Sequence, residues 1–268
     1  TTCARIITAY FSPTNTTKTV CETIAQELSR TLGIPHESRS FTLPGERTEP
    51  LVFPEGSLII LGMPVYAGRV PNFMLKYLTQ TEGNGSMGIP IVVYGNRNYD
   101  ELIELRDIME KAHIHTVAGG AFIGEHSFSR TLGQGRPDSQ DLNKARSFAQ
   151  VVASTISNDR YRTPVPVKGN VPYRPYMVPQ KADGSHKTIT KVFPKVSDAC
   201  TNCGVCVSVF LSLHRAGLPY VHDVLCQMLR LRQGLSVGAR YYDDETYLFH
   251  KKQLEETYAR RAEPETFI

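Results

Sequence analysis

One turn of the sequence collects an unusual number of groups that could bind an anion. The segment Phe11-Ser12-Pro13-Thr14-Asn15-Thr16-Thr17-Lys18 holds four hydroxyl side chains and one amide, directly after the β-branched run Arg5 to Tyr10. A helix N-terminus offers unpaired N–H groups and a partial positive charge, so hydroxyls that converge there form a site for a phosphate dianion. An ordinary helix cap needs only one such residue. The turn contains neither GxxxxGK(S/T) nor GxGxxG, so it is not a Walker loop or a dinucleotide fingerprint.

A second group of residues has the spacing of metal ligands. Cys200, Cys203 and Cys206 form the pattern CxxCxxC, which supplies the first three thiolates of a bacterial-type 4Fe–4S site. In the two-cluster arrangement a fourth cysteine, followed by proline, comes four positions after the third. Phe210 and Leu211 stand at those two positions here. Since the N-terminus suits a strand better than a signal peptide, the six cysteines are not expected to form a disulfide framework.

The elements that must position these residues follow an α/β pattern. From residue 3 to about 158, short β-branched runs alternate with longer helical stretches, which predicts a parallel sheet covered by helices on both faces. The first helix, for example, repeats Val20, Ile24, Ala25 and Leu28 at helical spacing. We expect strands near 4–10, 36–42, 57–63, 89–95 and 115–123, and helices near 15–32, 71–80, 99–112 and 138–157.

The rest of the chain changes character. Residues 159–190 contain five prolines interleaved with Tyr and basic residues, so they predict a linker that wraps over one domain rather than a helix or a central strand. Residues 191–245 contain the cysteine motif and form the predicted small α+β module. A charged helical tail is expected over 246–268.

The overall composition excludes several classes of partner. Thirty Lys and Arg face 26 Asp and Glu, a net charge of +4, and no dense basic block suggests nucleic-acid binding. No apolar run approaches the roughly 18 residues that a membrane span needs. We therefore expect a soluble, cytoplasmic protein with no nucleic-acid partner.

The hydroxyl-rich turn resembles the FMN-phosphate loop of flavodoxins, which is usually written Ser/Thr-x-Thr-Gly-x-Thr. Asn15 stands where Gly is common, and Asn tolerates a positive φ better than other non-Gly residues. Five strands with four intervening helices also fit a flavodoxin-like sheet. The resemblance therefore implies an FMN site at the carboxyl ends of the strands, beside the topological switch point.

Two further loops fall where the resemblance places the isoalloxazine ring. In Pro64–Pro71, small residues let the backbone approach the ring, Tyr66 can stack on it, and Arg69 can compensate the negative charge of the reduced flavin. In Tyr94–Tyr99, Gly95 permits close approach and the other side chains offer polar or aromatic contacts. A third segment, Gly124–Phe128, is expected to line the same mouth, where His126 is either a donor to flavin or substrate or a solvated bystander. The residues predicted to contact FMN are Ser12, Thr14, Asn15, Thr16, Thr17, Pro64, Val65, Tyr66, Ala67, Gly68, Arg69, Tyr94, Gly95, Asn96, Arg97, Tyr99 and His126.

The chain as a whole resembles a family in which a flavodoxin-like domain is fused to a ferredoxin domain with two 4Fe–4S clusters. Residues 210–236 do not carry this resemblance. A Cys codon can lie one nucleotide out of frame where a codon ending in TG precedes one that starts with T or C. Four codon pairs meet this condition with the spacing CxxCxxCxxxC: Leu225–Cys226, Met228–Leu229, Leu231–Arg232 and Leu235–Ser236.

We therefore hypothesise that at least part of 210–236 comes from compensating frameshifts, in the gene or in its sequencing. In the written frame, Cys226 is either a fourth cluster ligand or a buried structural cysteine. A clean in-frame DNA sequence, shared by close relatives, would contradict the frameshift hypothesis.

Three functions are compatible with these patterns. The first is an electron-transfer flavoprotein that passes electrons between FMN and iron–sulfur clusters or an external redox partner. The second is an FMN-dependent reductase of quinones or other small acceptors, in which His126 or Tyr99 delivers a proton. The third is a non-redox anion- or nucleotide-binding module with vestigial cysteines.

Overall fold

The computed structural model describes residues 3–187, 192, 195–203 and 239–268. The chain divides into two compact units that interleave in sequence. The first unit consists of Thr1–Glu125, Gly133–Tyr176 and Arg261–Ile268, and the second consists of His126–Leu132 and Met177–Arg260. The predicted metal ligand Cys206, together with Cys226 and the segment 210–236, lies outside the described residues.

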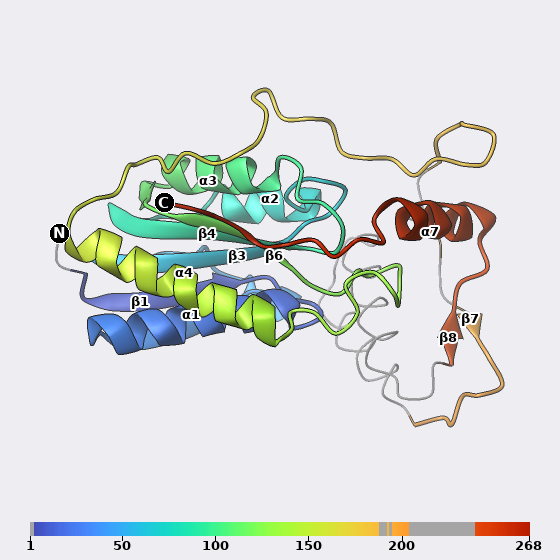
Figure 1. The fold of residues 1–268 in the computed structure, drawn as a ribbon, viewed down its shortest axis with the longest axis horizontal. Helices are drawn as coiled ribbons and strands as arrows, with labels where there is room; N and C mark the ends of the chain where they lie inside the picture. The colour runs from blue at the N-terminus through green and yellow to red at the C-terminus, as the bar shows by residue number, and fades with distance from the viewer. Residues whose placement is uncertain (1–2, 188–191, 193–194, 204–238) are drawn as a thin grey trace. The chain divides into compact units, whose positions relative to one another are not determined.

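The first unit is built on a mostly parallel sheet (Figure 1). Its strands are β1 (Arg5–Tyr10), β2 (His36–Ser40), β3 (Ser57–Pro64), β4 (Ser86–Tyr94), β5 (Ile114–Thr116), β6 (Gly119–Ile123) and β9 (Glu265–Phe267). The strand order is β2-β1-β3-β4-β6-β9, and β5 also pairs with β4. Leaving β9 aside, this is the 2-1-3-4-5 order of the flavodoxin-like doubly wound fold. The predicted fold class is therefore confirmed at the level of an α/β flavodoxin-like sheet.

Four helices cover the two faces of this sheet: α1 (Thr16–Leu32), α2 (Asn72–Leu78), α3 (Glu101–Lys111) and α4 (Ser139–Ser157). Helices α1 and α4 lie on one face, and α2 and α3 lie on the other (Figure 1). Because successive strand side chains point to opposite faces, Ile6 joins the α1/α4 core whereas Ile7 joins the α2/α3 core. Both side chains are fully buried, as the continuous apolar runs of a two-sided parallel sheet require.

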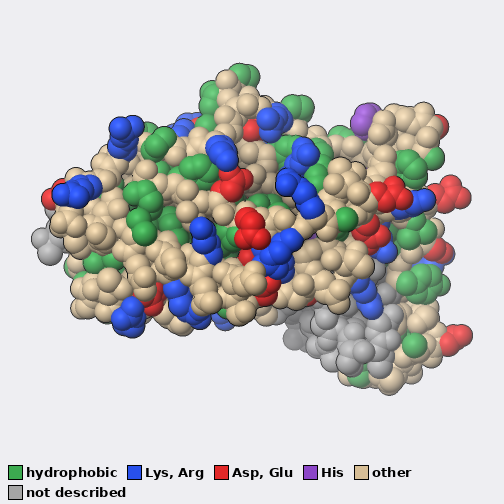
Figure 2. All heavy atoms as spheres, viewed as in Figure 1, with side chains coloured by type: hydrophobic (Ala, Val, Ile, Leu, Met, Phe, Trp, Pro, Cys, Tyr) green, Lys and Arg blue, Asp and Glu red, His purple; other side chains and the backbone are tan. Residues whose placement is uncertain are grey.

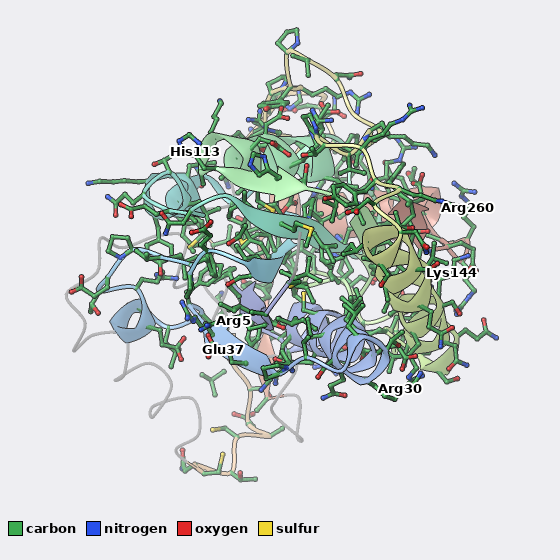
Figure 3. All side chains as sticks on the ribbon, turned by 90° about the vertical axis from the view of Figure 1, so that its left-hand side faces the viewer. Arg5, Arg30, Glu37, His113, Lys144 and Arg260 are labelled. Carbon is green, nitrogen blue, oxygen red and sulfur yellow. The ribbon has the colours of Figure 1, made fainter. Side chains whose placement is uncertain are left out.

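The sheet has two unlike edges. Figure 3 faces the edge where strands begin, with Arg5 at the start of β1, Glu37 in β2, and Arg30 near the end of α1. The opposite edge receives the carboxyl ends of β1, β3, β4 and β6, and the helices α1, α2, α3 and α4 follow these strands in the chain. The loops that carry the predicted FMN residues of the first unit all lie at this second edge.

The number of strands is a correction to the prediction of a five-stranded, wholly parallel sheet. The sheet has seven strands, for two reasons. The expected fifth strand is split at Val117 and Ala118 into β5 and β6, and β9 adds an antiparallel strand to the free edge of β6. The predicted helical tail is correspondingly shorter, because α7 (Glu245–Thr257) ends before the chain extends into β9.

The second unit contains α7 and a two-stranded antiparallel sheet, β7 (Lys195–Val196) with β8 (Arg240–Tyr241). Tyr242 and Tyr247 stack with ring centroids 4.4 Å apart and form its small apolar core. A ferredoxin-like module is not visible in the described part of this unit.

The charged side chains and the helices bear on what the composition predicts. On the face seen in Figure 2, Lys and Arg side chains are interspersed with Asp and Glu. Within the described residues, no helix combines the length and the apolar composition needed to cross a membrane.

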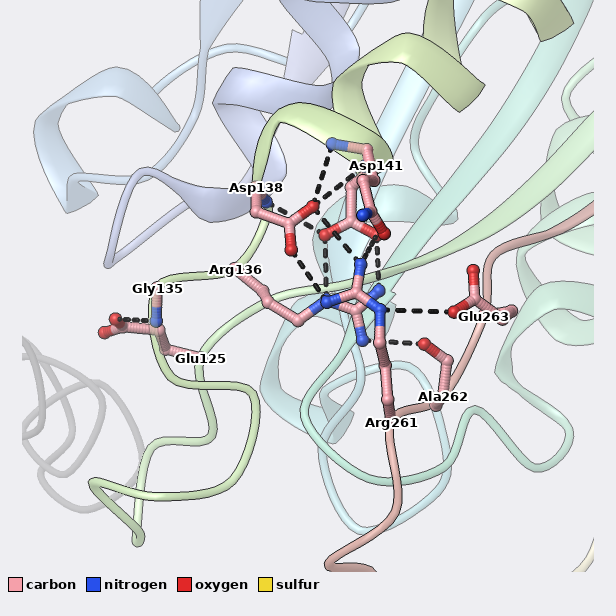
Figure 4. Close-up of polar contacts among 9 residues, drawn as sticks. Glu125, Gly135, Arg136, Asp138, Asp141, Arg261, Ala262 and Glu263 are labelled. Carbon is pink, nitrogen blue, oxygen red and sulfur yellow. Dashed lines mark hydrogen bonds and ion pairs between the residues drawn. The ribbon is translucent and has the colours of Figure 1, made fainter.

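A buried ion pair secures the C-terminal segment to the first unit (Figure 4). Arg136 donates from Nε to Asp141 Oδ2 over 2.8 Å, its Nη2 contacts the other carboxylate oxygen, and its Nη1 donates to the Ala262 carbonyl over 2.6 Å. The side chains of Arg136 and Asp141 are only 6% and 1% exposed. Arg261 pairs with Asp138, which caps the N-terminus of α4.

Removing one charge of this pair should destabilise the first unit strongly. We expect Asp141→Asn to lower the free energy of unfolding by about 3 to 5 kcal/mol, because Arg136 is left buried without its counter-ion. Glu263→Gln is the control, since that exposed carboxylate meets only Arg261 and should change stability by less than about 1 kcal/mol. Urea denaturation followed by circular dichroism measures both, and equal stabilities would contradict the role of the ion pair.

Candidate functional site

The hydroxyl-rich turn is held in shape by its own side chains and by the end of β2. Asn15, the N-cap of α1, adopts the left-handed conformation with φ 65°, as the sequence comparison with Gly at that position suggested. The Lys18 amide donates to Ser12 Oγ over 3.0 Å, and the Ser12 amide donates to Thr42 Oγ1 over 2.9 Å. These bonds bend the chain from β1 into α1 and turn the first amides of the helix toward the sheet edge.

Several donors at this turn remain unused. The Thr17 side chain is 1% exposed, yet its Oγ1 has no hydrogen-bond partner among the described residues. The amides of Thr16 and Thr17 open α1, where a helix offers no acceptor of its own, and within the described part of the chain neither donates elsewhere. A buried hydroxyl and two amides without acceptors are the groups that a phosphate would satisfy.

Space beside the turn is provided by a glycine. A Cβ at Gly124, just after β6, would lie 2.9 Å from the Thr16 Cβ and 2.8 Å from Val93 Cγ1. Any side chain there would collide with the start of α1. The loop after β6 can therefore pass close to the hydroxyl-rich turn only because residue 124 is a glycine.

The first predicted ring-side loop forms a tight turn. Tyr66 and Arg69 exchange both backbone hydrogen bonds, each 3.1 Å, and the two residues between them are left-handed, with φ 52° at Ala67 and φ 79° at Gly68. The conformation of Ala67 is uncommon for a residue with a Cβ. Strained turns of this kind cluster at ligand-binding sites.

The second ring-side loop packs directly on the first. Tyr99 also has a positive φ, 43°, and its ring lies so close to Gly68 that a Cβ there would be 3.0 Å from Tyr99 Cδ2. The Asp100 amide donates to the Gly68 carbonyl over 3.3 Å. The structure thus brings Gly68 and Tyr99 together, as expected for two loops that end neighbouring strands.

Of the other residues predicted to contact FMN, some lie at this edge of the sheet and others are buried in the core. Pro64 and Tyr94 end β3 and β4, and Tyr94 is 6% exposed within the α2/α3 core. The Val65 amide donates to the Val93 carbonyl over 2.9 Å. Beyond them, Gly95 and Asn96 are partly exposed, and the Arg97 guanidinium lies 5.6 Å from the centre of the Tyr99 ring.

Arg69 is already paired inside the first unit. Its guanidinium donates twice to Glu104, at 2.7 Å for each bond, and hydrogen bonding to Glu104 raises the Arg69 pKa. The carboxylate neutralises its charge locally, so compensation of a reduced flavin by this side chain remains a prediction.

His126 belongs to the second unit, and its place at the predicted flavin site of the first remains a prediction. Its ring lies 5.7 Å from the ring of Phe128, and Phe128 also contacts Tyr247 and His250. Burial lowers the His126 pKa to about 4. A neutral imidazole keeps one N–H that can donate a hydrogen bond, so the two roles that the sequence suggested for His126 remain predictions.

The predicted metal ligands are only partly described. Cys200 donates weakly to Asn202 Oδ1 over 3.7 Å, and Cys203 is exposed. Across the described ranges, no three His, Cys, Asp or Glu side chains are grouped to hold a metal ion.

Three residues shape this edge through contacts that the sequence did not predict. Thr42 fixes the Ser12 amide, Gly124 leaves space at the start of α1, and Phe11 packs edge-on against Tyr66 with centroids 6.4 Å apart. The hydroxyl of Thr42, directly after an expected strand, was a detectable pattern. The other two roles depend on contacts between distant segments.

No protein-family model and no curated protein matches the chain. Among solved structures, a flavodoxin from the domain Archaea is similar at 16% identity and TM-score 0.40, covering 57% of this chain and 99% of its own. The Flv1 flavodiiron core from Synechocystis sp. PCC6803 is similar at 14% identity and TM-score 0.41, over 59% of this chain and 37% of its own. A flavone reductase is similar at 7% identity and TM-score 0.43, over 63% of this chain and 67% of its own. These likenesses are weak, and the fold assignment rests on the strand order.

One buried acid at this edge has no role in the contacts above. Glu101, the first residue of α3, is 0% exposed, and neither carboxylate oxygen has a hydrogen-bond partner among the described residues. Burial and the charge of Glu104 raise its pKa well above the ordinary value, with Arg69 opposing them. The folded protein therefore favours the neutral acid.

This shift makes the stability depend on pH. The folded state keeps the Glu101 proton where the unfolded chain releases it, so stability should fall as pH rises above about 4.3, the unfolded value. Glu101→Gln removes the ionisation; we expect this variant to be more stable than wild type at pH 7 and to lose the advantage toward pH 4. Urea denaturation across this range tests it, with the exposed Glu37→Gln as control. Parallel pH profiles for wild type and Glu101→Gln would refute the buried-acid assignment.

Proposed function

We propose that the first unit binds FMN at the carboxyl edge of its sheet and that the chain passes electrons between FMN and a redox partner. The observation that carries this proposal is the start of α1. There a left-handed Asn15 is followed by two amides and the buried Thr17 hydroxyl, none of which has a hydrogen-bond partner among the described residues. These groups suit a phosphate ester, and the strand order puts them at the switch point where such folds bind ligands.

The neighbouring turns suit a flat ring beside that phosphate. Gly68 offers backbone without a side chain, and Tyr66 and Tyr99 supply aromatic surface from two adjacent loops. In this proposal Thr16 and Thr17 hold the phosphate, and the turn Tyr66–Arg69 and Tyr99 orient the ring. FMN supplies redox chemistry in which two electrons are accepted and released one at a time, while the chain provides binding and electrostatic surroundings.

A reductase of small acceptors would need a proton donor, and His126 is the weaker of its two candidates, His126 and Tyr99. Burial lowers the pKa of this imidazole to about 4, so near neutral pH it is uncharged and a poor acid for the proton delivery that a reductase needs. The redox partner is another protein or a small acceptor. A 4Fe–4S cluster on Cys200, Cys203 and Cys206, with transfer of electrons to it, stays a prediction.

Thr17→Val should separate phosphate binding from ring binding. A hydrogen bond to a charged group contributes about 1.5 to 3 kcal/mol, so we expect FMN affinity to fall about 10- to 100-fold. Riboflavin, which lacks the phosphate, should bind wild type and variant equally. The matched control is Thr23→Val, because the Thr23 hydroxyl bonds only the Thr19 carbonyl within α1. Fluorescence titration measures these affinities, and unchanged FMN binding in Thr17→Val would contradict the phosphate site.

The purified protein should show flavin absorbance bands with about one FMN per chain. Quantitation of iron in the same sample tests the cysteine motif, since about eight iron atoms per chain would indicate two complete clusters. Flavin without stoichiometric iron would support a carrier that uses an external partner. A protein that takes up no FMN would favour the non-redox anion-binding alternative.

A further inference from the structure

We infer that Arg69, Glu104 and Tyr176 form a clamp that positions the turn Tyr66–Arg69 for the flavin ring. The inference rests on the proposed function and adds Glu104 and Tyr176, which touch neither phosphate nor ring in that proposal. All parts of the clamp belong to the first unit.

Arg69 uses its guanidinium entirely within this unit. Nε and Nη2 donate to the two Glu104 oxygens, and Nη1 donates to the Arg174 carbonyl over 2.7 Å. Its Cζ lies 4.9 Å from the centre of the Tyr173 ring and 4.8 Å from that of Tyr176. The side chain is only 14% exposed. A planar cation held by a two-point ion pair and two rings fixes the end of the turn in one orientation.

The next residue, Val70, is held through both of its backbone groups. Its amide donates to Glu104 Oε2 over 3.0 Å, and its carbonyl accepts from the Tyr176 hydroxyl over 2.6 Å. Glu104 therefore binds the side chain of one residue and the backbone of the following one. The two residues that follow the left-handed pair Ala67–Gly68 are therefore both held by hydrogen bonds to other segments of the first unit.

The tyrosines come from a segment far along the chain, residues 165–176, which we call the strap. It runs past α3 (Figure 1), and a Cβ at Gly169 would lie 2.3 Å from Ile103 Cγ2. The fully buried Asp100 accepts from the strap amides of Asn170 and Arg174, over 2.9 and 2.7 Å. The strap is thus fixed to the start of α3 independently of the turn that it holds.

The clamp counteracts the unfavourable backbone conformation of the turn Tyr66–Arg69. A left-handed conformation is unfavourable for a non-Gly residue such as Ala67 and persists only where the surroundings enforce it. The exchanged Tyr66–Arg69 bonds close the turn, but they do not orient it against the sheet. The clamp supplies that orientation, so the turn is ready for a ring before any ligand arrives.

The test begins with the full chain without flavin. Tyr176→Phe keeps the ring beside Arg69 but removes the bond to the Val70 carbonyl. We expect hydrogen exchange at the Tyr66, Arg69 and Val70 amides to accelerate about three- to tenfold, the effect of one hydrogen bond. Tyr173→Phe is the matched control, because its hydroxyl bonds Asp107 instead, and these amides should stay within about twofold of wild type.

Binding then shows whether the turn serves the ring. Tyr176→Phe should weaken the binding of FMN and of riboflavin by the same factor and leave the affinity for inorganic phosphate unchanged. Glu104→Gln should have the larger effect on both flavins. Should Glu104→Gln fail to fold, Tyr176→Phe alone decides, since it removes a single oxygen.

The inference is overturned, with the proposed function intact, if Tyr176→Phe leaves exchange at the turn unchanged, or if exchange is faster while flavin affinities equal those of wild type. A wild-type chain that binds no FMN refutes the proposed function itself, and the inference with it. Weaker FMN binding with unchanged riboflavin binding would also overturn the inference, because the substitution would then act at the phosphate and not at the ring.

Discussion

Parallel strands all end at the same edge of their sheet, and this constraint determines where the chain can do chemistry. The loops after β1, β3 and β4 come from segments tens of residues apart, yet the sheet delivers them to one place. The helices that follow begin there too, so the unpaired amides of α1 face the same region as the glycines and aromatic residues of the neighbouring loops. The phosphate turn and the ring-side turns are thus products of one topology.

Negative charge along α3 is the second organising feature. Asp100, Glu104 and Asp107 lie at the start of this helix or along it, and each carboxylate receives hydrogen bonds from the strap or from the turn after β3. Acidic residues suit the first turn of a helix. Here the same charges also fix two distant segments, which isolated helix propensity does not require. Glu101 differs, because it lies inside with no such partner and is more stable as the neutral acid.

The sequence predicted the first unit well because its elements follow local rules. The bounds of helix α1 and of strand β3 were each predicted to within one residue, since apolar periodicity and turn residues mark both. The positive φ at Asn15 was also foreseeable from its place in the motif. By contrast, β9 is a short segment that becomes a strand only by pairing with β6, and the split between β5 and β6 depends on how each aligns with β4. The clamp joins residues 35 to 106 positions apart, so no local pattern could reveal it.

The return of the chain to its first unit also constrains the order in which the protein can be made. Strand β9 and the Arg136–Ala262 contact belong to the unit that begins with β1, but residues 177–260 are synthesised before they can form. A nascent chain therefore exposes the β6 edge while the second unit emerges, and an open edge is a template for pairing with other chains. The β6 edge can be covered by β9 only after residues 177–260 have been made.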